Sequence, residues 1–286
     1  MGSAPARSRP YPDPTARGRA ALESELRHAV EAGELELHYQ PRLCLRTGRL
    51  CGAEALVRWR TAEHGVLLPD DFIPVAEQTG LIAPLWEWVV DTACRHASAA
   101  WCTSQGLPLM ISVNLSPTQL CVPHPADMLQ AVLTRHVLAP ERLEIELTES
   151  ALMADVHCAT LSLVEIVELG VRLALDDFGT GYSSLGLLAR LPVSTLKIAR
   201  PLVTGIAGSS RDAVIVRNII RMAHELGIEV VAEGVETESQ FAVLQRSCCD
   251  ELQGYLIGKP LGAAAFAAWL RRWNGSAVAT GAEAIV

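Results

Sequence analysis

Short apolar runs, most of them followed by a longer stretch with helical spacing, recur along this chain. Eight runs have the length of strands: 35–43, 53–59, 109–116, 142–149, 171–178, 195–200, 229–235 and 251–257. Repeated alternation of strands and helices is typical of an α/β protein built on a parallel sheet, and eight strands can close into a barrel. We therefore predict an α/β fold with a (β/α)8 barrel. A doubly wound open sheet is the alternative.

The segments between the runs predict helices, with one exception. The clearest helix is expected over 211–226, where one apolar stripe consists of Ile215, Ile219, Met222 and Leu226. Ser210 is its expected N-cap and Gly227 its expected C′ residue. A second helix is expected over 84–102, with a common face formed by Trp86, Val90, Ala93 and Ala97. The first two strands are joined by a short link containing Thr47-Gly48, which indicates a hairpin.

Length and composition fit one large globular domain. Half of the 286 residues are hydrophobic and a fifth are charged. Residues 1–17 lack periodicity and are predicted to be a disordered leader, 18–273 form the barrel, and 274–286 form a flexible tail. No run of about 18 apolar residues is present, which excludes a membrane-spanning helix in this chain. No apolar segment follows the first residues either, so they do not form a secretory signal.

The charge and the cysteines limit the partners and the compartment. The chain carries 32 acidic residues against 24 Lys and Arg, for a net charge of −8. Such a surface repels polyanions, so we expect neither DNA nor RNA as a partner. The eight cysteines include no Cys-x-x-Cys pair, and most lie in apolar stretches. We interpret them as reduced thiols of a cytoplasmic protein.

Each predicted strand supplies a polar residue, which lies late in nearly every run. These residues are Gln40, Glu54, Asn114, Glu146, Asp176, Lys197, Glu233 and Gln253. The interior of a barrel is filled by branched apolar side chains, and its chemistry lies at the mouth, where the carboxyl ends of the strands meet. Four carboxylates and Asp177 would repel one another at such a mouth, and Lys197 alone carries too little charge to compensate. Bound cations would make the cluster stable.

The types of ligand indicate which metal. Carboxylates and an amide oxygen, without Cys or His, are hard donors that suit Mg²⁺ or Mn²⁺. Asp176 could bridge two ions, and two ions roughly 3.5–4 Å apart are the usual arrangement for hydrolysing a phosphate ester. Lys197 could orient the attacking water, help to deprotonate it or stabilise developing charge. Taken singly, a glutamate at a strand end is more often a surface residue, and Asn114 could cap a turn. Only their joint occurrence favours a metal site.

Several strings in the chain are those of a known family. EALVRW at 54–59 resembles the signature that gives the EAL-domain family its name. The further matches follow in the family's order: YQP at 39–41, SVNLSP at 112–117, ELTES at 146–150, DDFGTGYSSL at 176–185, LKI at 196–198, AEGVET at 232–237 and QGYLIGKP at 253–260. The resemblance covers about residues 21–273. So many ordered motifs are a specific signal.

The resemblance implies a modified TIM (β/α)8 barrel whose first strand is antiparallel to the second. It also implies a phosphodiesterase that opens cyclic di-GMP to linear 5′-pGpG with two Mg²⁺ or Mn²⁺ ions per site. Carried over by motif, one ion would be held by Glu54, Asn114, Glu146 and Asp176. Asp176 would bridge to the second ion, which Asp177 and Glu233 complete. Lys197 matches the lysine that contacts the attacking water and forms the catalytic group with Glu233 and Asp177.

The resemblance extends to binding and regulation. The implied substrate contacts are Gln40, Leu56 and Arg58, with Glu236 and Gln253 shaping the site. Glu149 matches the glutamate that steadies the DDFGTGYSSL loop, which couples dimerisation to activity in the family. The expected partners are therefore cyclic di-GMP and a second copy of the chain. The segment 21–40 resembles one that often follows a sensor or cyclase module, so we expect such a module to be fused to this domain or to regulate it.

One departure from the family pattern leaves an alternative open. Ala199 stands where the family usually has an aspartate, and on a strand it would share a face with Lys197. We therefore expect reduced rather than absent activity, and an aspartate at 199 should raise turnover. The alternative function is a cyclic di-GMP receptor that is catalytically weak or inactive. Independently of the family, a metal-dependent barrel lyase or aldolase is a further alternative.

Overall fold

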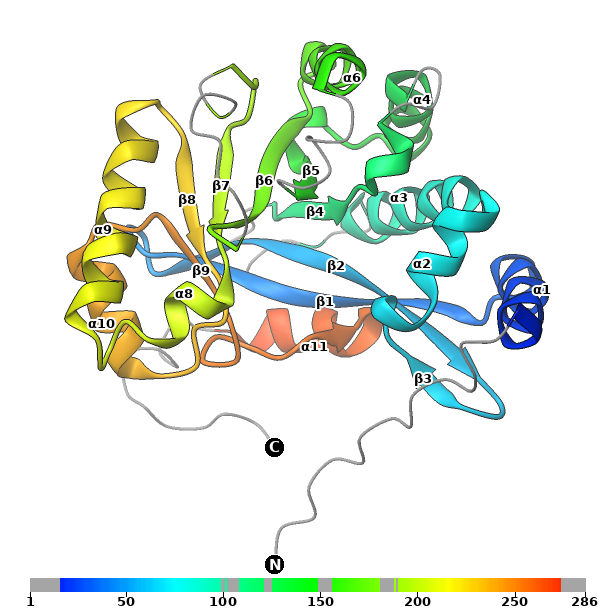
Figure 1. Ribbon diagram of the computed structural model, residues 1–286, viewed down its shortest axis with the longest axis horizontal. Coiled ribbons are helices and arrows are strands. Elements are labelled where there is room, and N and C mark those ends of the chain that lie inside the picture. Colours follow the sequence, from blue (N-terminus) through cyan, green and yellow to red (C-terminus); the bar gives the residue numbers. More distant parts are fainter. Residues whose placement is uncertain are drawn as a thin grey trace, which may run out of the picture.

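The strands form a closed ring. The computed structural model describes residues 16–98, 101, 108–120, 125–148, 156–180, 188 and 190–273. Around the ring, the order is β1 (Leu35–Cys44), β9 (Glu251–Gln253), β8 (Glu229–Ala232), β7 (Thr195–Ile198), β6 (Arg172–Phe178), β5 (Leu143–Thr148), β4 (Met110–Asn114) and β2 (Arg49–Thr61). Pairing between β2 and β1 closes it, and helices surround the strands (Figure 1). The predicted α/β barrel is confirmed, and the open sheet is excluded.

The first strand runs against both of its neighbours in the ring. β1 pairs antiparallel with β2 from one end to the other, from Leu35 opposite Trp59 to Cys44 opposite Arg49. It also pairs antiparallel with β9, whereas the other ring contacts are parallel. The link between β1 and β2 is a tight turn with Gly48 at φ +64°, too short for the crossover that a parallel pair needs. The predicted hairpin and antiparallel first strand are thus confirmed.

Two short strands extend this sheet and were not predicted. β3 (Gly65–Leu67) pairs antiparallel with the end of β2, and β10 (Leu261–Gly262) pairs antiparallel with β1. Both are too short to produce a recognisable apolar run. The helices are α1 (Ala16–Ala32), α2 (Pro69–Thr79), α3 (Ile82–Ser98), α4 (Pro125–His136), α6 (Val156–Glu168), α8 (Arg200–Thr204), α9 (Ser210–Glu225), α10 (Glu238–Arg246) and α11 (Ala263–Arg272), with 3-10 turns at Pro117–Gln119 and Pro140–Arg142.

The two helices expected from their spacing are present, but one faces differently. In α3 the predicted face is buried: Trp86, Val90, Ala93 and Ala97. In α9 the buried side chains are Val216, Ile220 and Ala223, whereas Ile215 and Leu226 of the predicted stripe are exposed. The two stripes are adjacent and both apolar, so spacing alone could not choose between them. The N-cap is Ser209, whose Oγ accepts from the Asp212 amide at 3.2 Å, rather than Ser210.

The barrel interior beneath the mouth is polar. Arg42, Ser112, Glu144 and Thr195 are each at most 1% exposed and contact one another inside the ring. The expectation of a wholly apolar filling is therefore wrong for this layer. Ion pairing and hydrogen bonding between the strands make the buried charges tolerable. The apolar core lies between the barrel and its helices instead, with residues such as Ile111, Ile145 and Val230 fully buried.

The remaining predictions concern the chain ends and the cysteines. Residues 1–15 and 274–286, which include most of the predicted leader and all of the predicted tail, lie outside the described residues, and Ala16 and Arg17 begin α1. Described cysteines are free thiols, in agreement with the prediction of reduced cysteines: Cys44, Cys51, Cys94, Cys248 and Cys249. Within the described part of the chain, every helix is too short or too polar to cross a membrane.

Candidate active site

Lys197 lies at the centre of the polar mouth. It is fully buried on β7, and its Nζ contacts carboxylates from four different segments. Glu146 Oε2 on β5 is 2.6 Å away, and Glu233 Oε1, which follows β8, is 2.7 Å away. Asp176 Oδ1 on β6 and Glu54 Oε2 on β2 lie at 3.3 and 3.5 Å. Acidic groups that are far apart in the sequence therefore meet around one ammonium group.

Three amide side chains complete this network. Asn114 Nδ2, at the end of β4, donates to Glu54 Oε1 at 2.8 Å. Gln253 Nε2, at the end of β9, donates to the other oxygen of Glu54 at 2.6 Å and lies 3.2 Å from Gln40 Oε1 on β1. All eight polar residues predicted at the strand ends are thereby brought together at the same end of the barrel.

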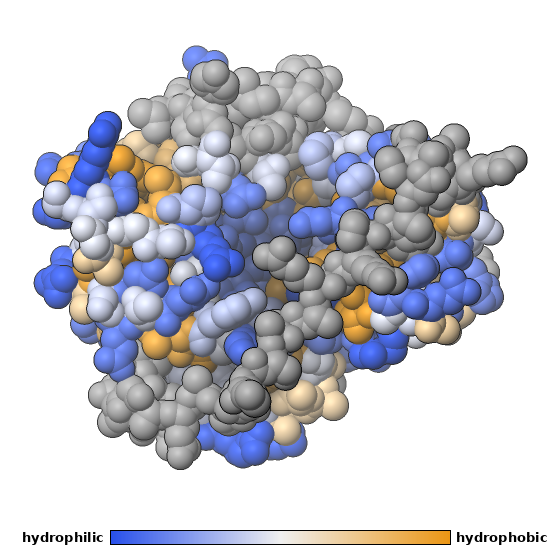
Figure 2. Space-filling view, turned by 60° about the horizontal axis from the view of Figure 1, so that its bottom comes forward, coloured by the Kyte–Doolittle hydropathy of each residue, from blue (hydrophilic) through white to orange (hydrophobic). Residues whose placement is uncertain are grey.

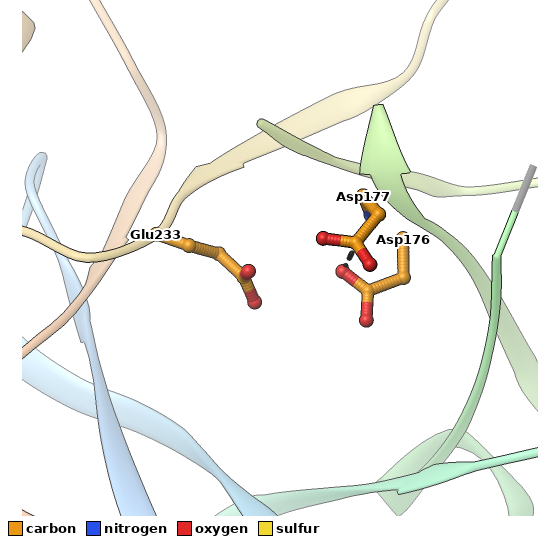
Figure 3. Close-up of side chains that lie close together, drawn as sticks. All are labelled: Asp176, Asp177 and Glu233. Atoms are coloured by element: carbon orange, nitrogen blue, oxygen red, sulfur yellow. Dashed lines mark hydrogen bonds between the residues drawn. The ribbon is translucent and has the colours of Figure 1, made fainter. Parts of the chain in front are cut away.

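Asp176 and Asp177 both reach the mouth because the backbone departs from a regular strand. Neighbouring residues on a regular strand point to opposite faces. Asp177 has φ +55°, a left-handed conformation that Asp tolerates better than most residues, and the register between β6 and β7 shifts between Leu175 and Phe178. The Asp177 amide donates to Asp176 Oδ1 at 2.8 Å. As a result, both carboxylates turn toward Glu233 (Figure 3), and the three groups offer oxygens within 4.8 Å of one another.

The charged groups of the mouth shift one another's pKa values. Burial lowers the pKa of Lys197, but its carboxylate neighbours outweigh burial and hold that pKa well above its ordinary value. Burial and the charge of Glu54 raise the pKa of Glu146 well above its usual range. Burial, opposed by Lys197, raises the pKa of Glu233 to about 7. Burial also acts on Glu54, but Lys197 and the two amide donors leave its pKa below the usual value. One ammonium group therefore does not neutralise the cluster.

The donor set fits divalent cations. Its ligands are carboxylate and amide oxygens, the hard donors that Mg²⁺ and Mn²⁺ prefer, and no His or Cys belongs to the group. Glu146 Oε1 is buried and has no hydrogen-bond partner, so an acceptor atom is available inside the mouth. Asp176, Asp177 and Glu233 form the cluster of close ligand atoms found among the described residues. A cation in the mouth would give Glu146 Oε1 a partner and would compensate the excess negative charge of the carboxylates.

The mouth opens into a cavity of about 220 Å³. Figure 2 shows a recess with hydrophilic walls on one face of the molecule. The lining combines predicted site residues with unpredicted ones: Gln40, Glu54, Asp176, Arg200, Glu233, Gly234, Glu236, Gln253, Gly254 and Tyr255. A second cavity of about 430 Å³ lies beside Asn114, between β2, α2 and α3, and has mostly apolar walls that include Leu56, Ile73 and Trp86.

Comparison with known proteins decides the family. The family model described as EAL domain matches residues 23–260. The chain belongs to the EAL-domain family. It is 45% identical over 267 residues to an uncharacterized signaling protein of Caulobacter vibrioides, a match that covers 93% of this chain and 32% of that protein. It is 43% identical over 246 residues to the bifunctional diguanylate cyclase/cyclic di-GMP phosphodiesterase MucR of Pseudomonas aeruginosa, covering 86% and 36%. The chain thus spans about a third of the length of these curated relatives.

Solved structures of EAL domains share the fold. The PaMucR phosphodiesterase in complex with c-di-GMP superposes with a TM-score of 0.79 at 43% identity, covering 86% of this chain and 99% of that one. The EAL enzyme Bd1971, bound to cAMP and cyclic di-GMP, superposes with a TM-score of 0.82 at 30% identity, covering 89% and 69%. These matches confirm the family and the modified barrel predicted from the motifs.

The residues expected to contact substrate are distributed over both cavities. Gln40, Glu236 and Gln253 line the first cavity, and Leu56 lines the second. Arg58 lines neither: it is half-buried, and its Nη1 donates to the Val57 carbonyl at 2.7 Å. Glu149 and residues 181–185 of the DDFGTGYSSL motif lie outside the described residues. The part of this motif that is described, 176–180, carries the two aspartates.

Two side chains that line the first cavity of this EAL domain were missed in the sequence. Arg200 lines the first cavity, and its Nη2 lies 2.8 Å from Glu236 Oε1. Its stem packs over Gly234, where an added Cβ would lie 2.2 Å from Arg200 Cγ. Tyr255 lines the same cavity and is half-exposed. A signal for Arg200 was present, because it is the last residue of the predicted run 195–200; in the structure it follows β7 as the first residue of α8.

Ala199 lies where β7 gives way to α8. Strand β7 ends at Ile198, and Ala199 (φ −59°, ψ 143°) is the N-cap of α8. The backbone at Ala199 is still extended, and its amide donates to the Phe178 carbonyl of β6 at 3.3 Å. Its side chain is fully buried. The expected effect of Ala199 on activity therefore stays a prediction.

Proposed function

We propose that this domain is a metal-dependent phosphodiesterase that hydrolyses cyclic di-GMP to linear 5′-pGpG. The observation that carries the proposal is the meeting of Glu54, Glu146, Asp176 and Glu233 around Lys197 at the carboxyl end of the barrel. The similar proteins support the choice of substrate, because MucR is named a bifunctional diguanylate cyclase/cyclic di-GMP phosphodiesterase and the PaMucR phosphodiesterase was solved in complex with c-di-GMP.

The ligands divide into two overlapping sets. Glu54, Asn114, Glu146 and Asp176 would hold one Mg²⁺ or Mn²⁺ ion. Asp176 would bridge to a second ion completed by Asp177 and Glu233, whose oxygens lie within 4.8 Å of that of Asp176. When bound, the two cations would polarise the phosphoryl oxygens and activate the attacking water.

The residues around the ligands would direct the reaction. The oxygen of one water adds to a phosphorus atom, the bond from that phosphorus to the ribose 3′ oxygen breaks, and a proton reaches the departing oxygen. Lys197, held among four carboxylates, remains an ammonium group. It therefore suits donation of a hydrogen bond to the water or to developing negative charge, rather than removal of a proton. A carboxylate such as Glu233 or Asp177 would take up the water proton and deliver it.

The two cavities would divide substrate recognition. The cavity over the ligands is lined by amide and charged groups, among them Gln40, Gln253 and Glu236, which suit the phosphates and riboses. The neighbouring cavity has the mostly apolar walls with a few polar groups that are typical of small-molecule sites, and Leu56 lies in its wall. Arg58 and Arg200 add positive charge near the mouth, which would help an acidic protein to bind an anion.

We also propose the setting in which the domain acts. Cyclic di-GMP is an intracellular messenger, so we place the domain in the cytoplasm. The family resemblance implies that it acts there as a homodimer. A sensor or cyclase module fused to the domain or acting on it would match the bifunctional cyclase/phosphodiesterase name of MucR.

The test is a hydrolysis assay with cyclic di-GMP under Mg²⁺ or Mn²⁺ titration. We expect linear product from the native chain and a loss of at least about 100-fold in Glu54→Gln, because replacing only a hydrogen-bond partner of a metal ligand already costs about 10- to 100-fold and Glu54 would be a ligand itself. Glu36→Gln is the matched control: Glu36 also lies in the β1–β2 hairpin but pairs with His38 and Arg60 at the surface. Native turnover no higher than that of Glu54→Gln would contradict the proposal. If the native chain binds cyclic di-GMP tightly but does not hydrolyse it at saturating metal concentration, the domain is a cyclic di-GMP receptor instead.

A further inference from the structure

Arg42 lies one layer beneath the mouth and belongs to none of the predicted site residues. It projects from β1 into the barrel and is 1% exposed. Its Nε donates to Glu251 Oε2 on β9 at 2.9 Å, and its Nη1 donates to Ser112 Oγ on β4 at 3.4 Å and to Glu144 on β5. A single guanidinium therefore connects β1 with β4, β5 and β9.

The same guanidinium reaches the mouth through β5. Glu144 and Glu146 are two residues apart on this strand, so both side chains point into the barrel. Arg42 Nη1 lies 3.8 Å from Glu146 Oε1, and Lys197 Nζ lies 2.6 Å from Glu146 Oε2. The carboxylate of Glu146 is thus held between two cations. Oε1 has no hydrogen-bond partner, so it is the oxygen left available for a ligand.

The layer around Arg42 is fixed from several sides. Glu144, fully buried, accepts from Thr195 Oγ1 on β7 at 2.7 Å and faces Arg172 Nε on β6 at 3.7 Å. The planar guanidinium, which keeps its charge, therefore has little freedom to move between Glu144 and Glu251. These two carboxylates also offset the charge of Arg42, so the group as a whole does not repel a cation in the mouth.

We propose that Arg42 is a positioning residue for Glu146: it fixes the direction of Glu146 Oε1 and thereby sets the affinity of the mouth for its first divalent cation. The inference rests on the proposed function, because it takes Glu146 as a metal ligand. Partners that orient metal ligands in this way typically change metal affinity by about 10- to 100-fold when they are replaced.

The experiment measures Mn²⁺ binding to the purified chain by titration calorimetry, without nucleotide. In Arg42→Met we expect the dissociation constant for the tighter ion to rise by about 10-fold or more. Arg172→Met is the matched control, because Arg172 lies in the same layer and pairs with Glu144 and Glu229 rather than with Glu146. Arg172→Met should change the constant less than about threefold. Arg42→Lys should restore part of the affinity, because it retains the charge but not the planar donor.

Folding and binding can be separated. If Arg42→Met leaves Glu144 buried without its partner and does not fold, the double variant Arg42→Met/Glu144→Gln is measured in its place, because it removes both charges of that pair. A weakened affinity for Mn²⁺ in a folded variant supports the proposal. Native-like affinity in the folded variants, or equal weakening in Arg172→Met, would overturn it. If the native chain itself binds no Mn²⁺, the proposed function fails, and the inference about Arg42 fails with it.

Discussion

Lys197→Met tests the electrostatic reasoning about the mouth most directly. The substitution keeps most of the side-chain volume but removes an ammonium that is 2.6–3.5 Å from four carboxylate oxygens. At an effective dielectric constant of about 20, one unit-charge pair at about 3 Å attracts by roughly 5–6 kcal/mol before desolvation is subtracted. Removing one partner of a buried ion pair typically costs about 3–5 kcal/mol, because the other charge is left uncompensated. We therefore expect the free energy of unfolding in EDTA to fall by about 3–5 kcal/mol.

The assay is urea unfolding followed by tryptophan fluorescence and circular dichroism, in EDTA and in Mn²⁺. Divalent cations can replace the missing charge, so saturating Mn²⁺ should recover much of the loss. Arg60→Met is the surface control: the Arg60–Glu36 pair has 62% and 35% of its side chains exposed, and exposed pairs contribute about 0–1 kcal/mol. A loss below about 1 kcal/mol for Lys197→Met in EDTA, or an equal loss with and without Mn²⁺, would refute this account.

Three further predictions follow from particular residues. Burial, opposed by Lys197, raises the pKa of Glu233 to about 7, whereas its pKa in the unfolded chain is about 4.3. In EDTA this carboxyl group therefore lowers the stability of the fold progressively as the pH rises from about 4.3 to 7. Thermal melts from pH 5 to 8 should show a smaller loss of stability with rising pH in Glu233→Gln than in the native chain, and equal slopes would contradict the pKa assignment. A Cβ at Gly254 would lie 2.1 Å from the Val235 carbonyl oxygen, a backbone atom that cannot easily move away. Gly254→Ala should therefore lower the free energy of unfolding by more than about 3 kcal/mol in urea unfolding. Gly48→Ala is the control: Gly48 has open space around it, so the substitution should cost only about 1 kcal/mol. Ala199 is fully buried two residues after Lys197, so Ala199→Asp should place a carboxylate near that ammonium group and raise turnover; unchanged or lower turnover would show that the alanine is no handicap.

The members of the mouth could be predicted from the sequence for a simple reason. A strand shows itself locally as an apolar run, and a polar residue near its end stands out against that run. In a barrel the carboxyl ends of the parallel strands meet at one end, so the order of runs already implied that Glu54, Glu146, Asp176 and Lys197 would come together. The structure shows the contacts between them.

Features that depend on a choice between equivalent local patterns could not be predicted. The buried face of α9 is one such case, because two adjacent apolar stripes compete and only packing against the barrel selects Val216, Ile220 and Ala223. Arg42 is another: in the sequence it is a single arginine after Pro41, and nothing local shows that it points into the barrel toward Glu144. Ala199 was placed on a strand because an apolar run does not mark where β7 gives way to α8.

By itself, then, the sequence determined the fold class, the antiparallel first hairpin and the list of residues at the mouth, because alternation, turn length and strand ends are local properties. Tertiary structure decided how those residues face one another. The left-handed backbone at Asp177, which turns two successive carboxylates to one side, and the buried guanidinium beneath Glu146 both depend on neighbouring strands. Such conformations are stable only when groups distant in the chain supply the compensating hydrogen bonds and charge, and those groups come together only when the barrel closes.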